Sequence, residues 1–405
     1  MSSTQVVSSE LPRISSDEFR DRQTRLRARA EERGLAGVFI WSRGATTQDH
    51  YADAFYFTNF YSQYPFVADE PGRWRAKGFV GVVIPVAGPV TVLTDLGSYR
   101  EDLVVADRVE TDQDVIRAAS HAIKRDVADG KIGLLGGAPL SFRWHRYLEA
   151  EVGARFVDVE DLGYLLRLIK SPAEQRLLRA AGRVGALGVE AIMDASVPGA
   201  TEAEVAAAGY EAVVAAGGMV YGMGISTGPY AHMHSQSQPA PFDPRRTLEA
   251  GDMSRVDFYG SVDGYLFDFG RTRVVGRAPD ESQQALIDAA RDCVTAGVEA
   301  IRPGATLGDV AAAADAAFAA SDLMRGPGAI PPEFKSYGHS LGLSWEAPFI
   351  DLDSSVVIEP GMCLAVERRT ARPGAGGATF EDNVLVVNDG YELLSDARRA
   401  WDAAD

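Results

Sequence analysis

An internal repeat is the feature that most constrains the fold of this chain. Gly188-Val-Glu-Ala-Ile192 is followed by Pro198-Gly-Ala-Thr201, and Gly297-Val-Glu-Ala-Ile301 is followed by Pro303-Gly-Ala-Thr306, about 105 residues later. Each threonine can be the N-cap of the alanine-rich helix that follows it, and Glu204 would complete a capping box in the first copy. The repeat predicts two copies of a helix-turn-helix unit; the alternative is a chance similarity between low-complexity segments.

Each copy continues into an apolar strand that carries an acid. Residues 248–257 match residues 358–367 in pattern, and the matched segments end in Asp257 and Glu367. We therefore expect these two carboxylates at equivalent ends of two strands.

Two further acids are expected on the neighbouring strands. Asp263-Gly264 is typical of a two-residue hairpin turn, and it would pair the strand of Asp257 with a strand that carries Asp268. In the second copy a glycine-rich loop, 373–377, leads to Glu381, which opens an apolar strand. The pattern thus brings four carboxylates to one sheet.

Four carboxylates in a buried cluster indicate a bound cation, because like charges in a medium of low dielectric constant repel one another. The alternative is that each acid lies in water at a strand end, as most single acids do. An imidazole ligand is expected with them, and His339 lies in a glycine-rich segment ahead of the Glu367 strand. His234, 105 residues before His339, is either its pseudo-symmetric counterpart or, with His232, an exposed loop residue.

The first 165 residues alternate between helical and strand-like patterns, which predicts an α/β lobe without catalytic residues of its own. Ser171 can cap a helix that begins at Pro172 and runs to about Ala195, so we place the domain boundary between 1–165 and 166–405. The expected helices of the lobe are 17–33, 115–128 and one from Ser141, and its expected strands are 37–41, 79–85, 89–93, 131–135 and 155–159.

Composition argues against several functional classes. The 57 acidic residues outnumber the 40 lysines and arginines, and the net charge of -17 would repel the phosphate backbone of a nucleic acid. No apolar run approaches the ~18 residues that a membrane-spanning helix needs. The two cysteines, Cys293 and Cys363, lack the spacing of a metal or disulfide motif, and the first ten residues do not resemble a secretion signal. We therefore expect a cytoplasmic protein with no nucleic-acid or membrane partner.

The motifs resemble those of the creatinase, aminopeptidase P and prolidase family of metallopeptidases. The resemblance covers about residues 165–395, and more weakly the N-terminal lobe, which is similar to a creatinase-type domain. It implies an α/β N-terminal lobe plus an α+β "pita-bread" catalytic domain with an internal pseudo-twofold repeat. The residues that carry it are Asp257 and Asp268 with Arg271-Thr272, Gly338-His339, Gly361-Met362 leading to Glu367, and Glu381-Asp382.

The resemblance also implies a site and a reaction. Asp257, Asp268, His339, Glu367 and Glu381 would hold two divalent metal ions that share a bridging hydroxide. We expect manganese, with cobalt, iron or zinc as alternatives, because oxygen and imidazole donors do not select one of them. The bridging hydroxide would cleave an Xaa-Pro peptide or another small amide, Glu367 would carry the proton to the leaving nitrogen, and the enzyme would be a homodimer.

One departure from the family leaves the substrate open. Family peptidases usually carry a histidine before the glutamate of a His-Glu-x-Pro stretch, and here that stretch begins Trp345-Glu346. An indole N–H can only donate, so either His232 or His234 substitutes as the catalytic histidine, or the substrate is not a peptide. The alternative is a non-peptidase of the same fold, such as a creatinase-like amidohydrolase or a dimethylsulfoniopropionate-lyase-like enzyme; a catalytically silent binding protein is opposed by the intact ligand set. The residues expected to line the substrate pocket are Trp345, Glu346 and Tyr221.

Overall fold

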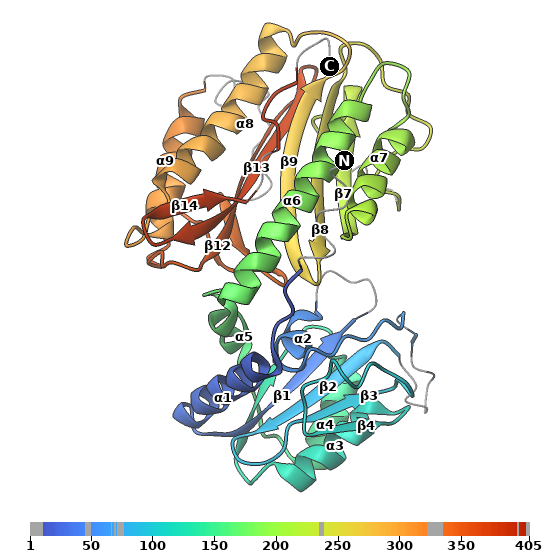
Figure 1. Cartoon of the computed structure of the whole chain (residues 1–405), viewed down its shortest axis with the longest axis vertical. Coiled ribbons are helices and arrows are strands. Elements are labelled where there is room, and N and C mark those ends of the chain that lie inside the picture. Colours follow the sequence, from blue (N-terminus) through green and yellow to red (C-terminus); the bar gives the residue numbers. More distant parts are fainter. Residues whose placement is uncertain are drawn as a thin grey trace. The chain divides into compact units, whose positions relative to one another are not determined.

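The chain forms two compact units. The computed structural model describes residues 11–44, 50–65, 67–68, 70, 77–234, 239–321, 335–394 and 397–401. One unit is Arg13–Arg167 and the other is Leu168–Asp405, with which Leu11 and Pro12 at the start of the described chain also group (Figure 1).

The N-terminal unit is a mixed α/β domain, which confirms the predicted lobe. Its sheet has the strand order β4-β3-β2-β1-β5-β6, and aromatic side chains such as Trp41 and Trp144 pack between this sheet and its helices. The elements of the unit are α1 (Ser16–Glu32), β1 (Leu35–Arg43), α2 (Ala52–Thr58), β2 (Phe79–Pro85), β3 (Thr91–Thr94), β4 (Arg108–Thr111), α3 (Val115–Asp126), β5 (Lys131–Leu135), α4 (Phe142–Val152), β6 (Phe156–Asp158) and α5 (Glu160–Arg167).

The C-terminal unit is built on a sheet with the order β11-β10-β12-β13-β9-β8-β7, and β14 pairs with β13. Helix α6 packs on β8 and β9 with α7 beside it, and α8 packs on β12 and β13 with α9 beside it (Figure 1). The elements are α6 (Pro172–Ala195), α7 (Glu202–Ala215), β7 (Met219–Thr227), a 3-10 turn (Gly228–Tyr230), β8 (Met253–Val262), β9 (Tyr265–Val274), α8 (Glu281–Ala300), α9 (Leu307–Ala319), β10 (Gly338–Leu341), β11 (Trp345–Phe349), β12 (Cys363–Arg372), β13 (Gly376–Val387) and β14 (Gly390–Leu393).

The repeat in the sequence is a repeat in the structure. Thr201 caps α7 and Thr306 caps α9, each in a complete capping box, so the two predicted helix-turn-helix units are confirmed. The second box uses Asp309, which the sequence interpretation had not included. Both units also make the same backbone contact, because Gly199 N–H donates to Leu248 at 2.9 Å and Gly304 N–H donates to Ile358 at 2.9 Å.

The predicted hairpin is confirmed, whereas the predicted strand ends are wrong. Asp263 and Gly264 form the turn between β8 and β9 with φ values of 49° and 85°, as a two-residue hairpin of the primed type requires. Asp257, however, lies in the middle of β8, Glu367 in the middle of β12 and Glu381 in the middle of β13.

The ends of these strands were predicted too early because the strands continue through buried polar side chains. Strand β12 continues past Glu367 to Arg372, through the buried residue Arg368. The guanidinium carbon of Arg368 lies 4.3 Å from the ring centroids of both Phe318 and Tyr337. Cation–π packing thus keeps an arginine inside the domain where hydropathy predicts the end of the strand.

Alternation along the strands separates a helix-facing side of the sheet from the opposite side. On the helix-facing side, a Cβ at Gly185 of α6 would lie 2.5 Å from the ring of Phe269 and 2.6 Å from that of Phe267, so glycine permits the close approach of helix and sheet. Asp268 lies between these two phenylalanines in β9 and therefore points to the opposite face. The acids of the repeat share that opposite face.

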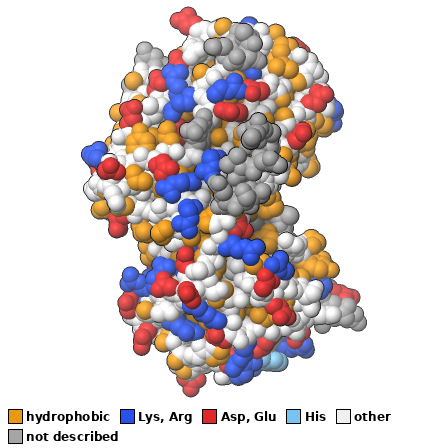
Figure 2. All heavy atoms as spheres, viewed as in Figure 1, with side chains coloured by type: hydrophobic (Ala, Val, Ile, Leu, Met, Phe, Trp, Pro, Cys, Tyr) orange, Lys and Arg blue, Asp and Glu red, His pale blue; other side chains and the backbone are white. Residues whose placement is uncertain are grey.

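The surface is mixed in charge. Acidic, basic and apolar side chains are interspersed on the face of the molecule seen in Figure 2. Among the described helices, none has both the length and the apolar character needed to cross a membrane.

Candidate metal centre

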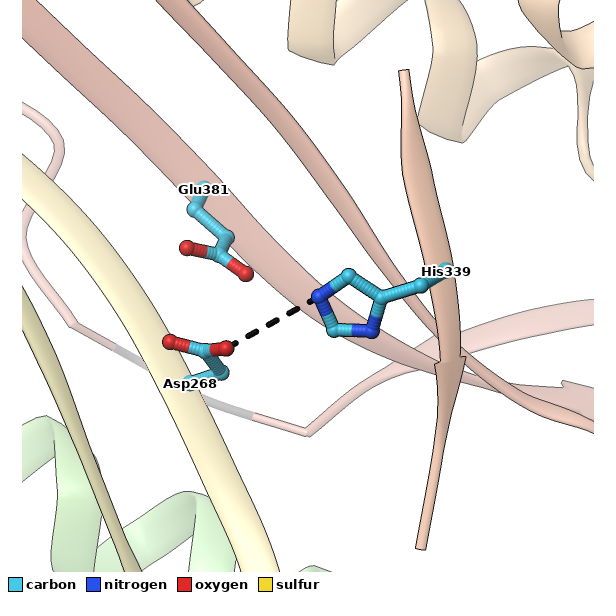
Figure 3. Close-up of side chains that lie close together, drawn as sticks. All are labelled: Asp268, His339 and Glu381. Carbon is cyan, nitrogen blue, oxygen red and sulfur yellow. Dashed lines mark ion pairs between the residues drawn. The ribbon is translucent and has the colours of Figure 1, made fainter. Parts of the chain in front are cut away.

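Three side chains converge on the face of the C-terminal sheet that lies opposite its helices. Asp268 comes from β9, His339 from β10 and Glu381 from β13, and one ligand atom of each lies within 4.8 Å of the others. His339 Nε2 lies 3.8 Å from Asp268 Oδ2. Figure 3 shows the three side chains pointing toward one another.

Strands β9 and β13 approach closely because Gly270 has no side chain. Gly270 is directly opposite Glu381, and a Cβ on it would lie 2.3 Å from Thr379 Cγ2 and 3.2 Å from Glu381 Cβ. Next to this crossing, Asn383 holds the backbone of Asp268 with both ends of its amide: Asp268 N–H donates to Asn383 Oδ1 at 2.8 Å, and Asn383 Nδ2 donates to the Asp268 carbonyl at 2.7 Å. The position of Asp268 is therefore set by β13 as well as by its own hairpin.

The two carboxylates of this group are buried, and each has an oxygen that no described residue satisfies. Asp268 is 5 % exposed and Glu381 is 1 % exposed. Asp268 Oδ1 and Glu381 Oε1 have no hydrogen-bond partner within the part of the chain that the structure describes. Burial raises the pKa of both carboxyls well above the ordinary values, and the negative charges of Asp257 and Glu367 raise the pKa of each further. A buried charge of this kind normally has a partner.

A divalent cation is a partner that fits these residues. Two carboxylates and an imidazole provide oxygen and nitrogen donors, which suit Mn, Fe, Co and Zn. A cation would also give a partner to the two carboxylate oxygens, Asp268 Oδ1 and Glu381 Oε1, that have none among the described residues. The described residues contain no other group of three such ligands at this spacing.

Asp257 and Glu367 lie at the edge of this group of three. Glu367 is half-buried and directly opposite Glu381 in the pairing of β12 with β13. Asp257 pairs with Gly270 on β9. Because the charges of both acids raise the pKa of Asp268 and of Glu381, the structure brings all four carboxylates into one interacting acidic centre.

Arg369 belongs to the same centre, and the sequence interpretation missed it. Its Nη2 donates to Asp257 Oδ2 and its Nη1 donates to His234 Nδ1. Its positive charge lowers the pKa of both Asp268 and Glu381, against the stronger effect of burial. One signal could have found it, because Arg369 is two residues after Glu367 in a strand and therefore shares its face.

The two candidate catalytic histidines lie in the segment after the 3-10 turn. His232 and His234 are both half-buried. His234 is bound to Arg369 and through it to Asp257, so it lies at the edge of the acidic centre and outside the three-residue group. His232 Cα would lie 3.1 Å from a Cβ built at Gly377.

Of the three residues expected in the substrate pocket, Trp345 lies in the acidic centre. Its Nε1 donates to Asp268 Oδ2, and its ring packs edge-on against Tyr259 with 5.0 Å between the centroids. Glu346 is buried, with Oε1 3.3 Å from a Cβ built at Gly342. Tyr221 is half-buried at an irregularity in the pairing of β7 with β8. The tryptophan that replaces the family's histidine thus donates to a proposed metal ligand.

An arginine behind the sheet supports the strand of Glu381. Arg271 is buried, its Nη1 donates to the Glu381 carbonyl at 2.7 Å, and its Nη2 donates to Asp382 Oδ1 at 2.7 Å. The guanidinium also lies 4.3 Å from the centroid of Phe380. Arg271 and Asp382, which carried part of the family resemblance, are therefore structural neighbours of the centre.

Comparisons with known proteins agree with this geometry. A model of metallopeptidase family M24 matches residues 176–388. The probable dipeptidase PepE of Mycobacterium tuberculosis is 32% identical over 268 residues, 64% of this chain and 68% of its own length. The Xaa-Pro dipeptidase of Lactobacillus helveticus is 28% identical over 262 residues, 63% of this chain and 68% of its own. The crystal structure of dipeptidase PepE from Mycobacterium ulcerans superposes with a TM-score of 0.74 at 26% identity, over 96% of this chain and 99% of that one. The fold of the chain is thus the pita-bread fold that the resemblance implied, and the matched residues include both repeats and all five acidic and histidine positions.

Proposed function

The chain belongs to metallopeptidase family M24, and from this we propose that it cleaves short peptides, with Xaa-Pro dipeptides as the first substrate class to test. The family makes the chain a metal-dependent hydrolase. The observation that carries the proposal is the convergence of Asp268, His339 and Glu381, with two buried carboxylate oxygens that no protein donor satisfies.

We propose that two divalent ions are held by the five residues expected from the sequence. Asp268, His339 and Glu381 would hold one ion, and Asp257 and Glu367 would complete the set for the second. Manganese is the first candidate, and cobalt, iron and zinc also suit the donors. When bound, such ions polarise a carbonyl group and lower the pKa of a bound water.

Glu367 is the proposed proton carrier. It is half-buried, and its backbone N–H donates to the Tyr337 carbonyl at 3.0 Å, which fixes its place on β12. A carboxylate in this position can take a proton from the attacking water and deliver it to the leaving nitrogen.

His234 is the proposed partner of the substrate oxygen, and His232 is the second candidate. Since the Arg369 guanidinium can only donate, His234 Nδ1 accepts, and its proton must be on Nε2. An imidazole in this form donates a hydrogen bond, which is the property needed to stabilise a developing oxyanion. We further propose that Trp345, Glu346 and Tyr221 contact the substrate.

A second candidate function is a non-peptidase reaction in the same fold. Trp345 favours it, because this residue replaces the family's histidine and uses its N–H to bind Asp268. A creatinase-like amidohydrolase or an elimination like that of a dimethylsulfoniopropionate lyase would not require that histidine.

Two further properties are proposed from the resemblance and the composition. The enzyme is proposed to be a homodimer, which sedimentation at assay concentration would measure. It is proposed to work in the cytoplasm, which suits two buried cysteines that are both free.

The test is a panel of Xaa-Pro dipeptides assayed with the chelator-treated protein before and after Mn²⁺ is restored. Turnover should depend on Mn²⁺ and should fall at least about a hundredfold in Asp268→Asn, since a metal ligand is lost. Asp309→Asn, which changes a capping acid on α9, is the matched control and should keep wild-type activity. Metal binding without dipeptide turnover would favour the second candidate, whereas a protein that binds no divalent ion would refute both.

A further inference from the structure

We infer that Arg369 is a built-in competitor for the second metal ion: it must release Asp257 Oδ2 before that ion can bind this oxygen. The inference rests on the proposed metal-dependent function and adds a prediction about the order in which the two ions bind. The observation behind this inference is that the side chain of Asp257 is bound to an arginine, whereas among the described residues the side chains of Asp268, His339 and Glu381 are not.

Among the described residues, the first position holds no cationic partner. Asp268, His339 and Glu381 already present ligand atoms within 4.8 Å of one another. Asp268 Oδ1 and Glu381 Oε1 have no hydrogen-bond partner within the described part of the chain, and Asp268 Oδ2, which faces His339, accepts only from the neutral Trp345 Nε1–H. An ion that binds here displaces no charged group and relieves a repulsion between buried carboxylates.

The second position is different, because its ligand Asp257 is engaged. Arg369 Nη2 donates to Asp257 Oδ2, and the two side chains are 11 % and 16 % exposed. His234 Nδ1 accepts from the other guanidinium nitrogen, so the arginine is held from two sides. An ion that uses Asp257 Oδ2 must displace a charge-assisted hydrogen bond in a largely dehydrated place.

The competition cannot be removed by loss of a proton. Arginine stays protonated in proteins. As long as the guanidinium remains beside Asp257, its positive charge also opposes a second divalent ion a few ångströms away. An ion that binds Asp257 Oδ2 therefore requires the guanidinium to move away from this oxygen.

This device is specific to one half of the repeat. Position 369 follows Glu367 by two residues, as Tyr259 follows Asp257. Tyr259 packs against Trp345 and carries no charge, while Arg369 reaches across the sheet to Asp257. The second half thus supplies the cation that neutralises an acid of the first half.

The experiment is a titration of the metal-free full-length chain with Mn²⁺ alone. Calorimetry measures the two affinities, and electron paramagnetic resonance distinguishes isolated from paired ions. In the wild type the first equivalent should bind at least about tenfold more tightly than the second and give the spectrum of isolated Mn²⁺. In Arg369→Gln the second affinity should tighten about ten- to a hundredfold, the size expected for loss of one charge-assisted pair, and by more than the first affinity does, because only the second position loses a direct contact with the guanidinium. Spin-coupled Mn²⁺ should then appear at a lower concentration.

Three further variants make the test specific. Arg369→Lys keeps the charge and should leave the second equivalent weak. Arg179→Gln removes the same charge from the ion pair between α6 and Glu392 on β14, and it should bind both equivalents as the wild type does. Asp257→Asn should keep the first equivalent and lose the second, which tests the assignment even if Arg369→Gln does not fold.

The outcomes separate this inference from the function on which it rests. Two equivalents of equal affinity in the wild type, or a second equivalent that is unchanged in folded Arg369→Gln, would overturn the inference and leave the metal-dependent function in place. Loss of the first equivalent in Asp257→Asn would also overturn it. A wild-type protein that binds no Mn²⁺ would refute the proposed function itself.

Discussion

Replacing Asp268 by asparagine should stabilise the metal-free protein and abolish its stabilisation by metal. Asp268 is buried beside Glu381, and its Oδ1 has no hydrogen-bond partner among the described residues. An asparagine of nearly the same shape can still accept the hydrogen bond from Trp345 Nε1 with its amide oxygen, and its NH₂ group can donate to Glu381. The substitution therefore removes a buried negative charge and adds a hydrogen bond.

The expected gain follows from the geometry. Unit charges on ligand atoms within 4.8 Å repel by roughly 3–4 kcal/mol at an effective dielectric constant of about 20. The metal-free wild type relieves part of this repulsion by keeping a proton, because burial raises the pKa of both carboxyls. We therefore expect a net gain of about 2–3 kcal/mol for Asp268→Asn at pH 7.5. For a unit the size of Leu168–Asp405 this gain corresponds to about 4–12 °C in Tm.

The pH dependence has a definite sign. The folded-state pKa of Asp268 is raised, so the folded protein holds its proton more tightly than the unfolded chain does. The stability that this proton contributes is present below the unfolded pKa and is lost as pH rises through the folded pKa. The advantage of Asp268→Asn should consequently shrink when the melts are repeated near pH 4.

The assay is a thermal melt in chelator and again in excess Mn²⁺. With free Mn²⁺ at about 100 times its Kd, the free energy of unfolding of the wild type should rise by about 2.7 kcal/mol. That of Asp268→Asn should rise little. Asp382→Asn is the matched control, because Asp382 is also a buried acid but is paired with Arg271 at 2.7 Å and Arg399 at 3.0 Å. That variant should lose about 1.5–3 kcal/mol. If Asp268→Asn also melts earlier than the wild type in chelator, the reasoning that the centre is strained without metal is refuted.

Gly270→Ala should weaken Mn²⁺ binding measured by calorimetry, because its Cβ would lie 2.3 Å from Thr379 Cγ2 and 3.2 Å from Glu381 Cβ; an unchanged affinity would contradict the close approach of the two strands. Cys293 should resist alkylation at pH 8, since burial raises the pKa of its thiol to about 12 and the thiolate is the reactive form; labelling as fast as in the unfolded chain would contradict its burial. Binding of Mn²⁺ at pH 6 should release protons from Asp268 and Glu381, whose pKa values are raised; calorimetry in buffers of different ionisation enthalpy measures the release, and a value of zero would count against the assignment.

The sequence predicted those parts of the fold whose signals are local. The capping threonines and the Pro-Gly-Ala-Thr turns identified the helix pairs of both repeats, and the apolar runs identified β2 and β5 at their full length. Helix α2 was not predicted because six of its seven residues are buried, which leaves no polar face to give a helical period. Strand β4 was not predicted because it has four residues, none of them buried.

The acids and the histidine of the centre could be proposed from the sequence, but their partners could not. Arg369 and Asp257 are 112 residues apart, and Asn383 and Asp268 are 115 residues apart. These contacts depend on the pairing of β12 with β13 and of β13 with β9, which a single sequence does not encode in any short segment. A sequence pattern can identify a candidate ligand from its residue type and spacing. Its hydrogen-bond partner can be identified only when the register of several strands is known.

The register also explains why the two halves of the centre are not copies of each other. Asp257 is opposite Gly270 and Glu367 is opposite Glu381, so Gly270 and Glu381 occupy equivalent positions, and they are also paired with each other where β9 meets β13. An acid at both positions would place two side chains where a single Cβ on Gly270 already approaches Thr379 within 2.3 Å. The first half therefore supplies its second acid two residues earlier, as Asp268, at the position that Thr379 occupies in the second half. The asymmetry of the acidic centre thus follows from the close contact of two strands at the pseudo-twofold axis, and restoring a symmetric acid at Gly270 should displace Glu381 rather than add a ligand.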